Sequence, residues 1–241
     1  MSRGRIALVL LVAVAAFAVL GPLVRPVDPN AVDLAATLAS PTPVHPLGTD
    51  ESGRDVLARL MAGGRISLAV AVAAALLALL AGTLIGGIAG LRGGFADRLL
   101  TLVVDAALAI PVFFILLVVL TLFAPSAATL AVAIGFTSWM SIARLVRAEV
   151  LVLRESGYVA AARALGASSW RVFRHHLFRQ LEPTLGVAAS LAVAQAVLTE
   201  SALSFLGLGV QPPSSSWGNM LTGAETSLST TPLLAVYPGI L

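Results

Sequence analysis

The chain has 241 residues, of which 58% are hydrophobic and only 11% are charged, and its formal net charge is +3. Because soluble domains carry about a quarter of charged residues, this composition predicts an integral membrane protein. The sequence contains neither cysteine nor lysine, which excludes a disulfide framework, a thiolate metal site and a phosphate-binding loop with its lysine. Any ATP hydrolysis would therefore belong to another chain.

The first apolar run covers residues 6–24 and follows Arg3 and Arg5. Its length is close to the roughly 20 residues that a membrane-spanning helix needs. A signal peptide shares the basic start and the apolar core. We favour an uncleaved first transmembrane helix over residues 1–24, since no cleavage site is followed by a soluble domain.

Residues 25–65 are polar and rich in proline, and we expect them to form an extracytoplasmic loop. Asp50 or Ser52 can cap a short helix that runs to Leu60. The carboxylates of this stretch, next to a histidine, would also suit a metal ion, but solvated carboxylates at a helix start are commoner. We expect no metal site and no catalytic role there.

Further apolar runs predict an all-α core over residues 66–241. Gly82 and Gly86 have the spacing that lets two helices approach closely in lipid, and Pro111 interrupts the third run. The predicted spans are 66–91, 99–123, 127–142 and 184–198, the last continuing into ESALSFLGLGV. The run that opens at Pro232 is too short to span before Leu241, so we expect five complete spans and a truncated sixth.

Between the fourth and fifth spans, residues 158–183 are amphipathic and rich in arginine. Tyr158, Ala161, Ala162 and Leu165 share one face of a short helix that Gly166 ends. Ser168 or Ser169 can cap a second helix with an apolar stripe, and a proline marks its end or a kink. The stripe consists of Trp170, Phe173, Leu177 and Leu181, and the proline is Pro183. Such a pair of helices suits the groove of a partner or the surface of an acidic membrane.

The sequence AAARALG at 160–166, followed by RVFRHHLF, resembles the cytoplasmic loop of binding-protein-dependent ABC importer permeases. That loop reads EAA, three residues, then Gly, and docks in a cleft of the ATPase subunit. The resemblance implies that Tyr158 to Gly166, including Ala160, Ala161, Ala162, Arg163 and Leu165, couple this chain to the ATPase. Two positions depart from the pattern: Ala160 replaces the usual Glu, and Phe178 or Arg179 stands where the family has Pro.

Two further segments, HPLGTDESGRDVL and SFLGLGVQPP with SWGNML, resemble the C-type permease of dipeptide, oligopeptide and nickel importers. The resemblance implies a type I ABC importer transmembrane domain in a heterodimer with a homologous permease. Two ABC ATPase subunits would bind ATP and magnesium, and an extracytoplasmic binding protein would deliver the cargo. This chain would be no enzyme and would need no cofactor of its own.

The arginines predict the orientation of the helices in the cell membrane. With the N-terminus in the cytoplasm, eleven arginines lie inside and only Arg25, Arg54, Arg59 and Arg65 lie outside, as the positive-inside rule requires. Residues 158–183 then face the cytoplasm and residues 211–232 face outward. The basic residues are not interleaved with base-stacking aromatics, so we expect no nucleic acid partner.

Three polar residues in apolar runs are candidates for lining a translocation path. Asp105 and Glu200 are carboxylates, which are expensive in a bilayer and favour a partner or a wet cavity. The alternatives are a structural hydrogen bond for Asp105, a wetted interfacial carboxylate for Glu200 and a hydrogen bond to a neighbouring helix for Gln195. A secondary transporter would need inverted repeats, which the halves do not show, and the coupling-loop resemblance disfavours a membrane scaffold. We expect small peptides as cargo, with nickel or a metal chelate as the alternative.

Overall fold

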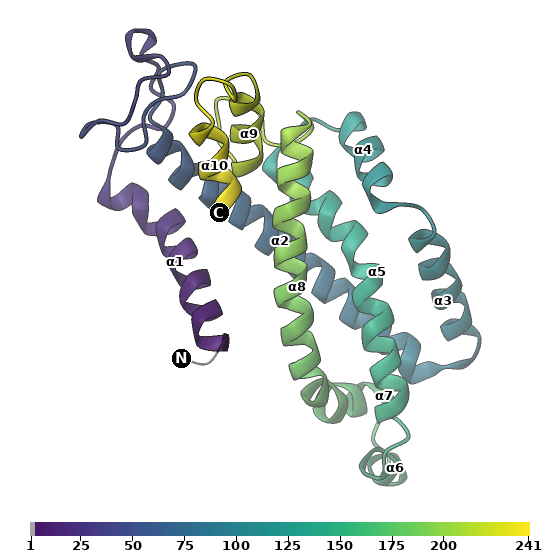
Figure 1. The fold of residues 1–241 in the computed structure, drawn as a ribbon. Helices are drawn as coiled ribbons and strands as arrows, with labels where there is room; N and C mark the ends of the chain where they lie inside the picture. The colour runs from purple at the N-terminus through teal and green to yellow at the C-terminus, as the bar shows by residue number, and fades with distance from the viewer. Residues whose placement is uncertain (1–2) are drawn as a thin grey trace. The chain divides into compact units, whose positions relative to one another are not determined.

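The computed structural model describes residues 3–241, and the described part is built from helices without a strand (Figure 1). They follow the apolar runs of the sequence, because a backbone in lipid must satisfy its polar groups within the helix. In chain order they are α1 (Arg3–Val24), η1 (Leu34–Ala36), α2 (Val56–Arg92), α3 (Gly94–Leu108), α4 (Val112–Leu122), α5 (Ala127–Leu153), α6 (Gly157–Ala164), α7 (Ser169–Val172), η2 (Phe173–Leu177), α8 (Phe178–Phe205), α9 (Trp217–Glu225) and α10 (Leu233–Ile240).

Four stretches of the described residues are long and apolar enough to cross a membrane. They are Gly4–Val24, Val56–Arg92, Ala127–Leu153 and Ser169–Phe205. A fifth is added if α3 and α4 count as one span, although their axes bend by 81° at the break. The break lies at Pro111, as the sequence predicts. The all-helical class is therefore confirmed, with four or five spans by length and composition.

The chain forms two compact units, and α2 and α8 contribute to both. The first unit contains residues up to Val70 with Leu120–Leu130 and Val197–Leu241, and the second contains Ala71–Val119 and Ala131–Ala196. In the first unit, Val56 and Leu60 of α2 form a core with Trp217 and Ala224 of α9 and Leu234 of α10.

The start of α2 differs from the expected short helix. Asp55 caps α2, since its Oδ1 accepts a hydrogen bond from the amide of Ala58 at 2.7 Å. The helix then continues without a stop through Leu60 to Arg92, a length of 37 residues or about 55 Å at 1.5 Å per residue. It is therefore longer than the hydrocarbon core of a bilayer, about 30 Å.

In the second unit α2 and α5 pack closely through small residues. A Cβ atom on Gly86 would lie 2.3 Å from the carbonyl oxygen of Ala143, and one on Gly82 would lie 2.7 Å from Ile142. The predicted close-packing face is thus confirmed. Helix α5 runs eleven residues beyond the expected end of its span at Ile142, which places Arg144 and Arg147 inside the helix.

Candidate functional site

The predicted coupling loop, residues 158–183, folds into two short helices joined by a tight turn. Gly166 has a positive φ of 82°, a left-handed conformation that only glycine adopts at little cost, and it ends α6 as predicted. The amide of Ala167 returns to the carbonyl of Ala162 at 3.0 Å. Of the two serines proposed as caps, Ser168 caps α7, because its Oγ accepts from the amide of Arg171 at 3.3 Å.

The loop is fixed to the second unit by a fully buried core. Val159 of α6 packs in one cluster with Val146 and Val150 of α5 and with Phe173 and Leu177 of η2. Each of these side chains is 6% exposed or less. The short helices are therefore attached to α5 by packed side chains as well as by the backbone.

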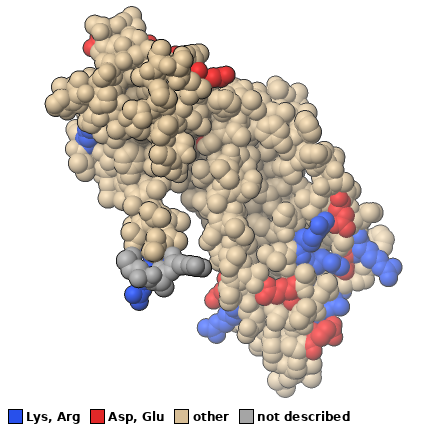
Figure 2. Space-filling model, viewed as in Figure 1, with Lys and Arg blue, Asp and Glu red and all other residues tan. Residues whose placement is uncertain are grey.

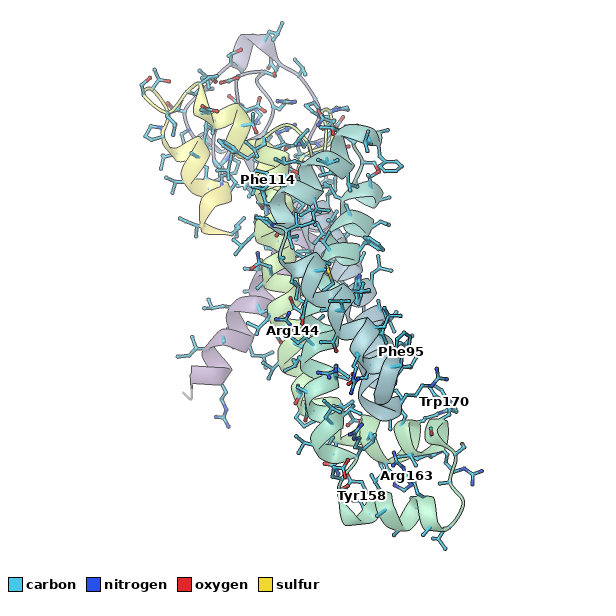
Figure 3. All side chains as sticks on the ribbon, turned by 90° about the vertical axis from the view of Figure 1, so that its right-hand side faces the viewer. Phe95, Phe114, Arg144, Tyr158, Arg163 and Trp170 are labelled. Atoms are coloured by element: carbon cyan, nitrogen blue, oxygen red, sulfur yellow. The ribbon has the colours of Figure 1, made fainter. Side chains whose placement is uncertain are left out.

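The other side of α6 is exposed and forms a surface with the start of α7. The exposed fractions are 42% for Tyr158, 89% for Leu165 and 61% for Trp170. Ala160, Ala161, Arg163 and Gly166 are also exposed, and Ala162 is half-buried. Figure 3 shows Tyr158 and Arg163 on α6 with Trp170 on the neighbouring α7, at one end of the second unit.

The structure refines two parts of the sequence prediction for this loop. In the predicted apolar stripe, Phe173, Leu177 and Leu181 are buried, whereas Trp170 is 61% exposed and its ring centroid lies 6.0 Å from that of Phe173. Of the two alternatives for Pro183, a helix end is wrong, since the residue lies inside α8, and a kink stays a prediction. The proline removes one backbone donor, and the helix continues past this exposed turn.

Asp105 is paired with an arginine of the same unit. Arg144 of α5 donates a hydrogen bond to Asp105 of α3 at 2.5 Å, and both side chains are about half exposed. Two turns earlier on α3, Asp97 accepts a bidentate pair from Arg147 of α5, with Nη2 at 2.8 Å from Oδ2. Figure 2 shows charged side chains of this unit gathered toward the end that carries α6 and α7.

Glu200 is fully buried in the first unit. Its carboxyl oxygens accept hydrogen bonds from Ser67 of α2 at 2.7 Å and from Ser204 of α8 at 2.6 Å. Both serines also accept a backbone amide at 3.2 Å: Ser67 that of Trp217, and Ser204 that of Val210. Glu200 therefore links α2, α8 and the segment after α8, whereas the sequence predicted a partner or a wet cavity without naming the partner. Gln195 is exposed on α8.

The segment after α8 also contacts the start of α2 and the chain just before it. The indole of Trp217 donates to the carbonyl of Leu60 at 3.1 Å, and Ser215 donates to the carbonyl of Arg59 at 3.1 Å. Glu51 accepts a hydrogen bond from Ser227 at 2.8 Å. The segment after α8 is thus held on the start of α2 by side chains far apart in the sequence.

Two acidic residues before α2, Asp50 and Asp55, form ion pairs with basic side chains. Asp55 accepts from Arg25 at 2.7 Å and lies 2.9 Å from Nδ1 of His45, and Asp50 accepts from Arg54 at 2.8 Å. Among residues 3–241, no group of three or more His, Cys, Asp or Glu side chains is placed to hold a metal ion. The carboxylates act here as caps and ion-pair partners.

The family model of the binding-protein-dependent transport system inner membrane component matches residues 82–241. The chain belongs to this family. The match covers α3 to α10 in full and so includes the loop of residues 158–183. The family is a component of transport systems in the inner membrane and not an enzyme, and the several apolar helices agree with a multi-pass membrane protein.

Relatives of this permease place it in the peptide and nickel subfamily. A protein of Brucella suis described as a peptide permease is 44% identical over 92% of this chain and 75% of its own length. The nickel transport system permease protein NikC of Escherichia coli is 38% identical over 98% of this chain and 85% of its own length. The dipeptide transport system permease protein DppC of Bacillus subtilis is 38% identical over 88% and 67%. The predicted resemblance to ABC importer permeases of this subfamily is therefore confirmed.

Proposed function

We propose that this permease forms half of the translocation path of an ATP-driven importer for small peptides. The observation that carries the proposal is the exposed surface of α6 and α7, which is attached to α5 through the buried Val159. A push on this surface reaches the membrane helices through packed side chains. The proposal also rests on relatives that are described as peptide and dipeptide permeases.

The proposed partners are a homologous permease, two ABC ATPase subunits and an extracytoplasmic binding protein. Residues 158–183 would dock in a cleft of one ATPase, with Tyr158 and Leu165 as its apolar contacts. ATP and magnesium would bind to the ATPases. ATP binding would then move the loop and favour one of two states of the path, and hydrolysis would restore the other.

We also propose that α10 is the start of a sixth span. The proposed orientation puts the N-terminus in the cytoplasm and residues 25–65 outside. Eleven arginines on one side against four on the other support it. Asp105 and Gln195 remain candidates for lining the path. For Glu200 we propose a place at its outer end, where the carboxyl group holds the segment after α8 on α2.

Docking of the loop can be tested with single cysteines, because the chain contains none. We expect Leu165→Cys, 89% exposed, to cross-link to a cysteine in the ATPase cleft of the assembled importer. Val187→Cys is the matched control, since Val187 is 64% exposed on α8 but lies outside the loop. Equal cross-linking of the two variants, or none with Leu165→Cys, would contradict the docking proposal.

Cargo is tested by uptake in cells that carry the complete operon and in cells that lack only this chain. We expect uptake of a labelled dipeptide to disappear with the chain. Nickel is the second candidate, because NikC matches 98% of this chain. If only the uptake of radioactive nickel is lost, the proposed architecture stands and the cargo is nickel instead of a peptide.

A further inference from the structure

An apolar groove of about 700 Å³ runs along the second unit between α2 and the segment that leads from α7 into α8. On α2 it is lined by Leu76, Leu80 and Leu84, which are 46 to 63% exposed and recur every four residues on one face of the helix. Phe178 and Leu185 line the opposite side. The volume lies within the roughly 300–1,000 Å³ that is usual for small-molecule sites.

The groove has one charged lining residue, Arg174. The ion pairs of residues 3–241 engage other arginines, and in this part of the chain Arg174 has neither a carboxylate partner nor a hydrogen bond. Arg174 is exposed, and Trp170 lines the same groove. Planar guanidinium groups pair well with phosphate, so this end of the groove is complementary to an anion.

Arg174 lies near the charged end of α2. Its neighbour Phe173 contacts α2 at Gly87, where an added Cβ would lie 2.5 Å from the ring. The charged end of α2 follows within five residues, at Arg92, or about 8 Å along the helix axis. The leucines continue from this level in the opposite direction, toward the apolar middle of the span. Tryptophan is enriched at membrane interfaces, and Trp170 lines this groove.

We propose that this groove binds one anionic phospholipid. The phosphate pairs with Arg174 beside Trp170, and an acyl chain lies along Leu76, Leu80 and Leu84. The alternative occupant is an apolar helix of a second permease chain. Such a helix would cover the guanidinium of Arg174 but offer it no hydrogen-bond acceptor, and an unpaired charge in lipid is costly. A phospholipid supplies both an apolar chain and the missing anion.

The test uses the assembled importer in phosphatidylcholine vesicles that contain phosphatidylglycerol with a photoreactive acyl chain. We expect adducts on peptides that contain residues 76–84 and 178–189, and several-fold fewer with a phosphatidylcholine probe of the same chain. Arg174→Gln should lower labelling by phosphatidylglycerol about fivefold, the effect of about 1 kcal/mol for one basic residue at an anionic surface. Arg171→Gln is the matched control, because Arg171 is exposed one turn away and does not line the groove.

A second variant tests the acyl chain independently of charge. Gly186 lines the groove, and an added Cβ would have open space around it. Gly186→Phe should therefore fill the groove and reduce labelling by both probes without disturbing the fold. Equal labelling by the two lipid probes would overturn the proposal. The proposal would also be overturned if Leu80→Cys formed a disulfide with the partner permease while no lipid adduct formed in the groove. A helix of the partner would then occupy the site. Labelling needs neither ATP nor cargo, so its outcome is separate from that of the uptake experiment.

Discussion

Removal of the Ser67 hydroxyl should destabilise the first unit of the permease. This hydroxyl donates to Oε2 of Glu200 at 2.7 Å and accepts from the amide of Trp217 at 3.2 Å. Ser67→Ala removes both contacts without adding volume, in a place where the serine and the glutamate are fully buried. The change leaves a carboxyl oxygen and a backbone amide without their partner, and water does not reach them.

The magnitude follows from these two contacts. Each lost partner of a buried polar group costs about 1 to 3 kcal/mol, and we expect a loss of about 2 to 3 kcal/mol in the free energy of unfolding. For a chain of this size that corresponds to a fall in Tm of about 5–10 °C. Tryptophan fluorescence during heating of the purified importer measures it, and Trp217 reports from the site itself.

Ser190→Ala is the matched control for Ser67→Ala. The Ser190 hydroxyl bonds only to the carbonyl of Gly186 in its own helix, at 3.0 Å, and the residue is exposed. We expect a change below about 0.5 kcal/mol, as for most surface substitutions. In a cycle with Glu200→Gln, the two destabilisations should be non-additive by about 1 kcal/mol or more, because the residues are in contact. Additive effects, or equal effects of the two serine substitutions, would refute the proposed link.

Two further predictions concern close packing and ion pairs. Gly218→Ala should destabilise the permease by about 1–3 kcal/mol, because its Cβ would lie 2.4 Å from the carbonyl oxygen of Ser201. Gly223→Ala has open space around its Cβ and should stabilise α9. The Tm values of the two variants check this, and a fall in both would contradict it. Asp97→Asn should lower Tm more than Asp105→Asn, because the Asp97 side chain is 13% exposed and that of Asp105 is 52% exposed. Exposed ion pairs, such as that of Asp105, contribute only about 0–1 kcal/mol to stability. A larger fall in Tm for Asp105→Asn than for Asp97→Asn would show that the pair of Asp97 with Arg147 does not hold α3 on α5.

Elements with a local signal could be predicted from the sequence. The break at Pro111, the end of α6 at Gly166 and the cap at Ser168 each depend on one residue with a restricted backbone or a suitable hydroxyl. A close helix contact at Gly86 was predicted in the same way, from the spacing of small residues, but its partner α5 was not. The family could also be predicted, because its motifs are short and contiguous.

Contacts between distant residues could not be predicted. Ser67 and Glu200 are 133 residues apart, and neither the periodicity nor the spacing of the sequence brings them together. The π-helical turn at Phe173–Leu177 could not be predicted either, because a search for a period of 3.6 residues does not find it. The role of Val159 was missed for a related reason, since its burial depends on α5 and not on the pattern of α6.

The buried cluster beneath the loop explains how a small helix can act on a membrane domain. Helix α6 has only eight residues, too few to be stable in water by itself, so its conformation depends on the packing of Val159 against Val146 and Val150. Phe173 in the same cluster also contacts α2 at Gly87. Tightly packed interiors transmit displacement because they have few voids to absorb it. In the proposed docking on an ATPase, a displacement of α6 would therefore be passed to α5 and α2, which is the mechanical property that such coupling requires.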